Sequence, residues 1–255
     1  MVVFAQERQE SIVSQVNAEG SVRVKDLSLK FEVTEDCIRK DLALLEKKGL
    51  LKKAYGGAVS VRLNPHLYNS EDRKKTPNDE RIVIGKKAFE LIENQDTIFL
   101  DVSLTSLEIA KLLRESTLQV TVITNMIDVL NILNHCQHIS MIFIGGQLNQ
   151  EGDGFWGTLA LEMVKLFKID KSFLGVVGVD TVNGKLSTYH IDDGMMKKSV
   201  IEQSQKSYLL CEERKLKEDG NYIFASLNDI SGLIVSKELS NKRKEILEEY
   251  GLIIR

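Results

Sequence analysis

The sequence predicts an α/β protein made of a small N-terminal domain of short helices and a larger open domain with a mainly parallel sheet. Residues 1 to about 60 alternate short helical patterns with tight breaks, whereas apolar runs alternate with helical patterns from about residue 80 onward. The segment between them is polar and carries both prolines of the chain, Pro65 and Pro77. We therefore expect domains over residues 1–58 and 80–255, joined by a linker over residues 59–79.

Size and composition are typical of a soluble protein. The chain has 255 residues, 43% hydrophobic and 28% charged. Its apolar runs are shorter than the ~20 residues that cross a bilayer, and its N-terminus lacks the pattern of a signal peptide. Three scattered cysteines without a C-x-x-C motif indicate a reducing compartment. We expect a cytoplasmic protein with no membrane partner, no metal and no cofactor.

Apolar spacing predicts the first two helices. They lie within "QERQESIVSQVNAEG" (6–20), which Gly20 ends, and "RVKDLSLKF" (23–31), which a break at Glu32–Val33 follows. Their expected buried positions are Ile12, Val13, Val16, Val24, Leu27 and Phe31.

A third helix is predicted to begin after Thr34, a good N-cap residue. Ile38, Leu42 and Leu45 follow at i, i+4 and i+7, which forms one buried stripe. Gly49 would end this helix in a left-handed conformation.

A hairpin is predicted directly after the third helix. "LLKKAY" (50–55) forms a strand, Gly56 and Gly57 form the turn, and "AVSV" (58–61) forms the return strand. Three helices and a two-stranded wing make a winged helix-turn-helix, whose third helix fits the major groove of DNA.

Positive charge gathers on this module. Between Arg39 and Lys53 lie six basic residues against two acidic ones, although the whole chain has a net charge of −3. Such cations neutralise phosphates beside the groove. A solvated surface or a protein-binding module would carry the same charge, but the helix spacing and the wing glycines favour DNA. Glu35 and Asp36 suit the helix dipole yet would repel phosphate, unless they point at a cytosine amino group or away from DNA.

Six short apolar runs predict strands buried on both faces of a parallel sheet. They are "TIFLD" (97–101), "VTVIT" (120–124), "ISMIFIGG" (139–146), "FLGVVGVD" (173–180), "SYLLC" (207–211) and "GLIVS" (232–236). Helical patterns lie between them, at 106–116, 127–136 and 158–167. An open α/β sheet binds ligands beyond the carboxyl ends of its strands, which selects Asp101 to Ser106, Thr124–Asn125 and Gly145–Gly146.

Two long stretches carry a family resemblance. Residues 20–59 are similar to a Ser-x-x-Thr-Ile-Arg-Arg-Asp-Leu helix followed by a His-Gly-Gly-Ala wing. "DTIFLDVSLTSLEIAKLL", "VTVITNMIDVLNIL", "MIFIGGQLNQ" and "FLGVVGVDTVNGKLS" resemble the sensor domain that accompanies it. Together they resemble the DeoR family of bacterial transcriptional regulators over nearly the whole chain. The resemblance implies a ribose-5-phosphate-isomerase-like sensor fold that holds a phosphorylated sugar and changes operator affinity.

The resemblance and the spacing together give two sets of expected site residues. The residues expected to contact DNA are Thr34, Cys37, Arg39, Lys40, Lys47, Lys48, Lys52, Lys53, Tyr55, Gly56 and Gly57. Arg39 is the leading candidate for base reading. The residues expected to bind the effector are Asp101, Ser103, Thr105, Ser106, Thr124, Asn125, Gly145, Gly146, Asp180, Arg214 and Lys215.

The chain departs from the family pattern in the recognition helix, the wing and the pocket. Cys37 stands for a threonine and Tyr55 for a histidine, which would alter which bases are read or weaken base reading altogether. Ser103 and Leu104 replace a glycine and a hydroxyl residue, and Cys211-Glu212-Glu213-Arg214 replaces Asp-x-Ser-Lys. A glycine lets backbone N–H groups close on a phosphate, so these changes weaken an anion site unless Arg214 or Lys215 compensates. A drifted or lost effector site is the alternative.

Two further motifs are better explained as structure. "GDGFWG" (152–157) fits G-x-G-x-x-G, but it does not directly follow a strand, so a loop over the pocket is favoured over a dinucleotide site. "HCQH" (135–138) is crowded at the end of a helix, which favours a turn over a zinc site.

We therefore expect a DNA-binding regulator, most simply a repressor of a carbohydrate-metabolism operon, that binds double-stranded operator DNA as a homo-oligomer. Two alternatives stay open. One is a sugar-phosphate isomerase with an appended helix-turn-helix, using Asp101, Asp180, Asp192 and Asp193 as acid/base groups. The other is a protein-binding adaptor. The attached module and the altered anion loop favour a regulator over an enzyme.

Overall fold

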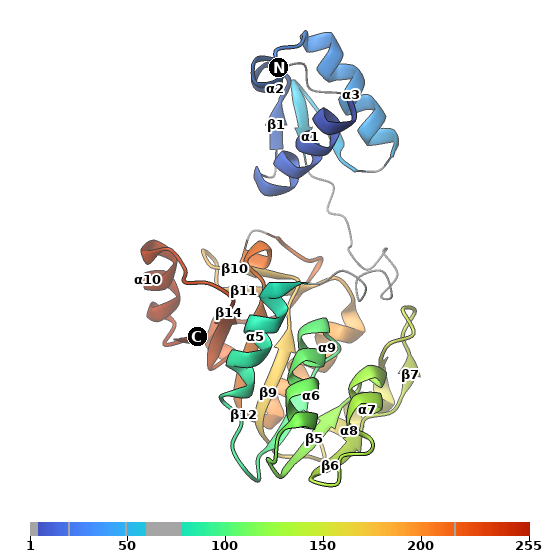
Figure 1. Cartoon of the computed structure of the whole chain (residues 1–255), viewed down its shortest axis with the longest axis vertical. Helices are drawn as coiled ribbons and strands as arrows, with labels where there is room; N and C mark the ends of the chain where they lie inside the picture. The colour runs from blue at the N-terminus through green and yellow to red at the C-terminus, as the bar shows by residue number, and fades with distance from the viewer. Residues whose placement is uncertain (1–4, 20, 49, 60–77, 217) are drawn as a thin grey trace. The chain divides into compact units, whose positions relative to one another are not determined.

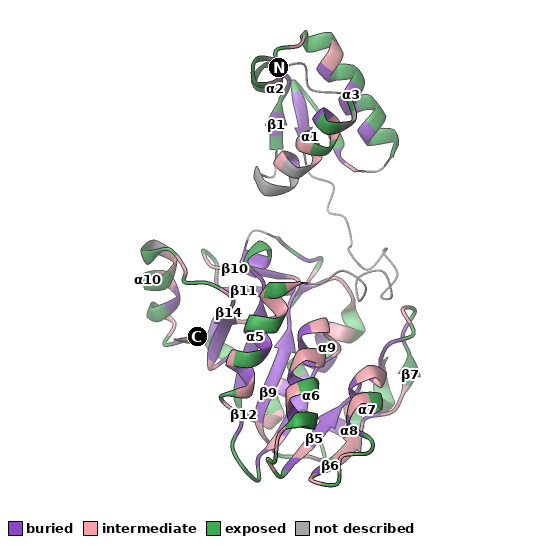
Figure 2. Cartoon of the chain, in the orientation of Figure 1, coloured by how far each residue is buried: buried purple, intermediate pink, exposed green. Residues whose placement is uncertain are grey.

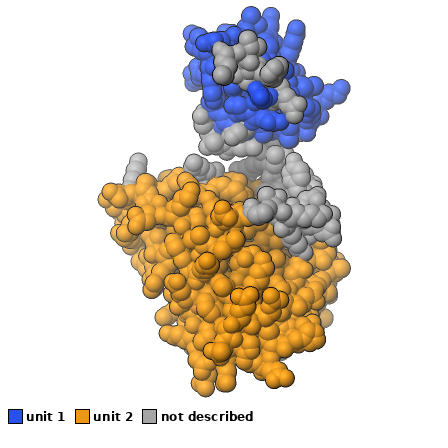
Figure 3. All heavy atoms as spheres, in the orientation of Figure 1, with its two compact units in different colours: residues 1–67 blue, residues 68–255 orange. Residues whose placement is uncertain are grey.

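The computed structural model describes residues 5–19, 21–48, 50–59, 78–216 and 218–255. The chain divides into two compact units, residues 1–67 and 68–255, which Figure 3 colours separately. The predicted domain limits stay a prediction, since most of the expected linker lies outside the described residues. The helix ends predicted at Gly20 and Gly49 lie outside them as well. No helix within the described ranges is long and apolar enough to span a membrane.

The first unit contains the three predicted helices. They are α1 (Ala5–Glu19), α2 (Val24–Phe31) and α3 (Glu35–Lys47). Three short strands, β1 (Ser21–Arg23), β2 (Lys52–Ala54) and β3 (Gly57–Val59), form an antiparallel sheet in the order β1-β3-β2 (Figure 1). The wing was predicted with two strands and has a third, β1, because the three residues before α2 pair with β3.

The wing turn differs from the prediction by one residue. Ala54 pairs with Gly57, so Tyr55 and Gly56 form the turn, and Gly56 has a φ of 75°. Gly57 lies in β3, where a Cβ would stand 1.9 Å from the carbonyl oxygen of Val22 in β1. The close approach of β1 therefore requires the second glycine.

The core of the first unit confirms most of the predicted buried positions. Val13 and Phe31, expected in the core, are only partly buried. The buried positions that the spacing predicted are Ile12, Val16, Val24, Leu27, Ile38, Leu42 and Leu45.

The second unit is built on a seven-stranded sheet in the order β15-β14-β12-β9-β4-β5-β6, with every neighbouring pair parallel. Each predicted apolar run holds a strand of it. The strands are β4 (Thr97–Leu100), β5 (Val120–Thr124), β6 (Ile139–Phe143), β9 (Ile169–Gly175), β12 (Ser204–Cys211), β14 (Gly232–Val235) and β15 (Ile253–Ile254).

Two smaller sheets extend this unit. The end of "FLGVVGVD" leaves the main sheet as β10 (Gly178–Asp180) and pairs with β11 (Lys185–Thr188), which pairs with β13 (Tyr222–Ser226). The glycine-rich motif at 152–157 belongs to a hairpin of β7 (Gln147–Leu148) and β8 (Phe155–Trp156). Short 3₁₀ turns span Glu213–Leu216 and Leu227–Asp229.

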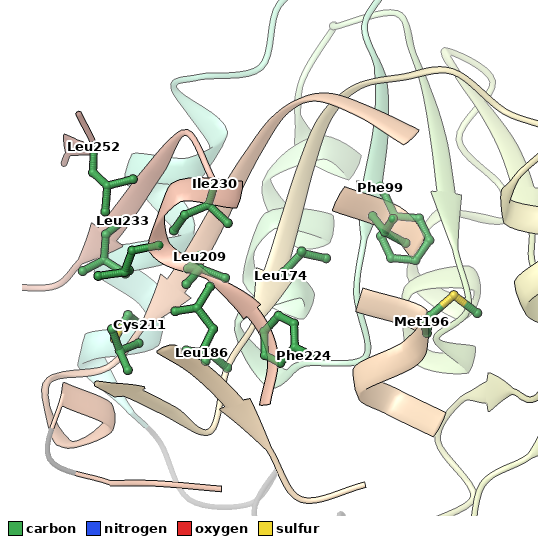
Figure 4. Close-up of a cluster of buried hydrophobic side chains, with 14 of the residues drawn as sticks. Phe99, Leu174, Leu186, Met196, Leu209, Cys211, Phe224, Ile230, Leu233 and Leu252 are labelled. Atoms are coloured by element: carbon green, nitrogen blue, oxygen red, sulfur yellow. The ribbon is translucent and has the colours of Figure 1, made fainter. Parts of the chain in front are cut away.

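Helices cover both faces of the main sheet, which explains the continuous apolar runs (Figures 1 and 2). Along β4, Ile98 and Leu100 pack against α5 (Asp79–Phe89), α6 (Leu104–Glu115) and α7 (Ile127–Leu133). Phe99 points to the opposite face, where α8 (Thr158–Val164), α9 (Ile191–Gln203) and α10 (Asn241–Glu249) lie. Figure 4 shows this second cluster, including Leu186 of β11 and Phe224 of β13.

Candidate DNA interface and effector site

The start of α3 is fixed by its cap. The side chain of Thr34 accepts a hydrogen bond from the backbone N–H of Cys37 at 3.3 Å, which confirms the predicted N-cap. The role predicted for Thr34 in binding DNA is a separate matter and stays a prediction.

A buried ion pair ties α1 to α3. Arg8 Nε lies 2.7 Å from Asp41 Oδ2, and the two side chains are 9% and 7% exposed. Gln9 donates to the other carboxylate oxygen at 2.8 Å, and Arg8 also donates to Cys37 Sγ at 3.3 Å. Cys37 is therefore partly buried against α1. Asp41 was not among the expected site residues, and this ion pair with Arg8, 33 positions earlier, gives it a structural role.

Arg39 is exposed but engaged by two carboxylates of its own helix. Its terminal nitrogens lie 2.6 Å from Glu35 Oε2 and 2.8 Å from Asp36 Oδ1. The sequence analysis did not pair Arg39 with these acids.

Most of the remaining residues expected to contact DNA lie on the surface of the first unit, but Gly57 is buried in β3 against β1. Lys47 and Lys48 end α3, and Lys52 and Lys53 occupy β2, all of them exposed. The backbone N–H of Lys53 donates to Glu46 Oε1 at 2.7 Å, which holds the wing against α3. Tyr55, at the wing turn, is fully exposed. Lys40 is exposed on α3.

Asp101 is the centre of a buried network at the carboxyl end of β4. The backbone N–H of Gly175 donates to Asp101 Oδ2 at 2.9 Å, and Lys197 Nζ lies 2.8 Å from the same oxygen. Lys197 also contacts Asp193, which accepts a hydrogen bond from Thr188 at 2.6 Å. Two carboxylates thus share one ammonium group.

Burial and the neighbouring opposite charges act against each other on the pKa values of Asp101 and Lys197. Burial raises the pKa of Asp101, and the charge of Asp193 adds to this against the opposing effect of Lys197. Burial alone would lower the pKa of Lys197, but the two carboxylates outweigh it and raise that pKa. Asp101 Oδ1 has no hydrogen-bond partner among the described residues, although Asp101 is fully buried.

The loop after Asp101 shows why a serine stands where the resemblance expects glycine. Ser103 is the N-cap of α6, with its hydroxyl accepting from the Ser106 backbone N–H at 3.2 Å. The hydroxyls of Ser103 and Ser106 lie 3.1 Å apart. Thr105 is buried in the same first turn. Asp101, Ser103, Thr105 and Ser106 thus lie together between the end of β4 and the first turn of α6, and their role in binding an effector stays a prediction.

The neighbouring strand places Asn125 beside the glycine-rich hairpin. Thr124 is structural, since its hydroxyl donates to the Leu100 carbonyl at 2.7 Å. The amide of buried Asn125 donates to the Phe155 carbonyl at 2.8 Å, while its Oδ1 has no partner among the described residues. Gly154 packs against Asn125 and Val102, so the hairpin lies over the ends of β4 and β5.

Arg214 and Lys215 lie in a second cluster around Glu212. Glu212 is buried, and Arg81, Arg214 and Lys215 each approach its Oε1 at 3.4 to 3.5 Å. Asn78, the N-cap of α5, donates to its Oε2 at 2.8 Å. Burial would raise the pKa of Glu212, but Lys215, Arg214 and Arg81 outweigh it and lower the pKa to about 2.

Of the three other expected effector residues, Asp180 and Gly146 have local structural roles and Gly145 has no close neighbour among the described residues. Asp180 accepts from the backbone N–H groups of Val182 and Asn183 in the turn after β10. The amide of Asn183 also lowers the pKa of Asp180. Gly146 approaches the carbonyl of Trp156, and Gly145 faces open space.

Sequence reasoning missed Lys197 and Gly175 of the Asp101 network, and it named Asp193 only as an acid/base group of the isomerase alternative. The spacing of Asp193 and Lys197 at i, i+4 is the one local signal they share. That spacing is common on exposed helices, so it gives no hint of burial. Within the described ranges, no three His, Cys, Asp or Glu side chains lie together as metal ligands would.

Comparison with known families identifies both units. Residues 8–63 match the DeoR-like helix-turn-helix domain, and residues 77–237 match the DeoR C-terminal sensor domain. Over 95% of this chain and 93% of the other, the sequence is 35% identical to the uncharacterized HTH-type transcriptional regulator YulB of Bacillus subtilis. It is 30% identical to the lactose phosphotransferase system repressor of Staphylococcus epidermidis, over 97% and 98% of the two chains.

Ribose 5-phosphate isomerase A of Methanocaldococcus jannaschii matches with a TM-score of 0.40 and 17% identity, covering 54% of this chain and 53% of that one. The sequence matches, by contrast, span both units. The chain therefore belongs to the DeoR family of DNA-binding transcriptional regulators.

Proposed function

We propose that this protein represses an operon of carbohydrate metabolism and that a sugar-derived effector changes its affinity for the operator. Relatives named as repressors support the first part. They include the lactose phosphotransferase system repressor described above and the HTH-type transcriptional repressor GlcR of Bacillus subtilis, 28% identical over 98% of this chain and 95% of its own. The exposed lysines on α3 and β2 would bind phosphates on either side of the groove.

One observation carries the effector proposal. Two buried oxygens at neighbouring strand ends, Asp101 Oδ1 and Asn125 Oδ1, have no hydrogen-bond partner in the described part of the chain. Buried acceptors normally receive a hydrogen bond, and the hydroxyl groups of a sugar would supply it. Any phosphate on that sugar would compete with Glu212 for Arg214 and Lys215.

A helix-turn-helix protein recognises paired half-sites through its own symmetry, so we propose a homo-oligomer. The second unit would hold its protomers together. We propose a regulator without enzymatic activity. Turnover of a pentose phosphate by the purified protein would support the isomerase alternative. Binding of a protein partner without any shift of DNA at low salt would support the adaptor alternative.

A footprint on the protein's own promoter, repeated with a panel of sugars and sugar phosphates, tests the proposal. Asp101→Ala should abolish the response to an active compound and leave operator affinity unchanged. Lys52→Ala should weaken binding to all sequences and reduce the salt slope by about one unit. Lys111→Ala, which removes an exposed cation in the second unit, serves as the control. An absent footprint at low salt would refute the function.

A further inference from the structure

The first turn of α3 carries a compact group of three charged side chains. Glu35 and Asp36 are the first two residues of the helix, and both reach Arg39, at 2.6 and 2.8 Å. The group has a net charge of −1. It therefore stands apart from the lysines that make the rest of this surface positive.

Fold stability does not account for this arrangement. The side chains of Arg39, Glu35 and Asp36 are 56%, 44% and 82% exposed, and exposed ion pairs contribute little to stability. Acidic residues in a first turn suit the helix dipole. The dipole does not explain why both carboxylates hold one guanidinium group.

The position of the group on α3 is the position that reads bases. Ile38, Leu42 and Leu45 bury one face of the helix. With 3.6 residues per turn, Asp36 lies on the opposite face and Arg39 beside it, both at the N-terminal end. The N-terminal residues of a recognition helix contact base edges in the major groove.

The negative charge of these carboxylates limits the DNA groups that they can contact. A carboxylate near the DNA backbone repels phosphate and weakens binding to every sequence. This repulsion is offset only by a hydrogen-bond donor on a base edge. In the major groove, those donors are the amino groups of cytosine and adenine. In an A·T pair, the adenine amino group lies next to the N7 acceptor of the same base. In a G·C pair, the cytosine amino group lies across from guanine, whose O6 and N7 acceptors suit an arginine.

We propose that Glu35, Asp36 and Arg39 together read a G·C base pair in each operator half-site. Asp36, the most exposed of the three, accepts a hydrogen bond from the cytosine amino group. Arg39 donates to guanine O6 and N7. Glu35 is a positioning residue that holds Arg39 along the helix. This inference rests on DNA binding by α3 and names the base pair that the helix selects.

The test is selection of bound sequences from a pool of randomised duplexes with the full-length protein. Wild type should enrich a half-site with an invariant G·C pair. Asp36→Asn should reduce the preference for that pair over A·T by about 5- to 150-fold and bind random duplex more tightly. Glu35→Gln should lose sensitivity to replacement of the guanine by 7-deazaguanine, which lacks the N7 acceptor.

Asp26→Asn is the matched control, because it removes the same charge from the first turn of the neighbouring helix α2. It should bind random duplex more tightly but keep the wild-type preference for the G·C pair. Circular dichroism checks that all variants keep their helices. Retention of the full G·C preference in Asp36→Asn overturns the inference while DNA binding stands. Failure of the wild type to enrich any sequence overturns both.

Discussion

Replacement of Lys197 by methionine tests whether the buried network at the end of β4 is held by one shared ammonium group. Lys197 is 4% exposed in its side chain and contacts Asp101, 1% exposed, and Asp193, 13% exposed. Methionine keeps most of the volume and removes the charge. Two carboxylates are then left close together with no cation between them.

The expected loss follows from the burial of the partners. Removal of one member of a buried ion pair costs about 3–5 kcal/mol, since the other charge stays buried without compensation. Thr188 still donates to Asp193, so we expect the lower end, about 3 kcal/mol. Asp101→Asn leaves Lys197 paired with Asp193 alone and should cost less than about 1.5 kcal/mol. Adding Asp101→Asn to Lys197→Met should therefore restore part of the stability.

The loss should also depend on pH. Burial already raises the pKa of Asp101 above its usual 3.8, and loss of Lys197 raises it further. A carboxyl group whose folded pKa exceeds its unfolded value stabilises the fold while protonated, and this contribution is lost as pH rises through the folded pKa. The difference in stability between wild type and Lys197→Met should thus shrink as pH falls from 8 toward 4.

Urea unfolding followed by Trp156 fluorescence measures these effects. Trp156 is the single tryptophan of the chain and lies in the same unit as Lys197. The shared-ammonium account would be refuted if the free energy of unfolding of Lys197→Met lay within about 1 kcal/mol of the wild-type value. It would also be refuted if Lys197→Met were more stable than Asp101→Asn.

Three other predictions test separate contacts. Gly57→Ala should cost about 1–3 kcal/mol, because its Cβ would meet the Val22 carbonyl; unchanged hydrogen exchange in the wing would contradict this. Arg8→Met should destabilise the first unit by about 3 kcal/mol by leaving Asp41 buried without its cation. Faster exchange in α1 with unchanged tryptophan unfolding is the expected signature. Glu212→Gln should remove a contribution of about 3 kcal/mol to the free energy of unfolding, and this contribution depends on pH in the acid range. The lowered pKa of Glu212, about 2 against 4.5, makes that stability present above pH 4.5 and lost as pH falls toward 2. Equal acid sensitivity of the variant and wild type would count against the assignment.

Local patterns predicted the elements whose signals are local. The strand at 120–124 was predicted with its observed bounds, because a sheet buried on both faces leaves a continuous apolar run. The recognition helix was predicted from Thr34 and a clean i, i+4, i+7 stripe. In contrast, β1 has only three residues, and pairing with β3 across 36 positions makes it a strand.

Non-local partners explain what could not be predicted. α9 carries Gly194 packed against Tyr222 and a lysine buried by Asp101, nearly a hundred positions earlier. Neither feature belongs to an amphipathic pattern, so the helix has no clear sequence signal. The pairing of Arg39 with Glu35 was visible as an i, i+4 spacing, but spacing alone does not tell which face of the helix the pair occupies.

Glu212 shows what the fold adds to a charge that the sequence could only count. The sequence treats its carboxylate as a group that weakens an anion site. In the fold it is itself the anion that Arg81, Arg214 and Lys215 surround, and it also binds the Asn78 side chain that caps α5. The cations at the end of β12 are therefore balanced from within the chain. A phosphorylated ligand gains contacts there only by displacing Glu212 from them, whereas a neutral sugar hydroxyl needs only the unpartnered oxygens of Asp101 and Asn125.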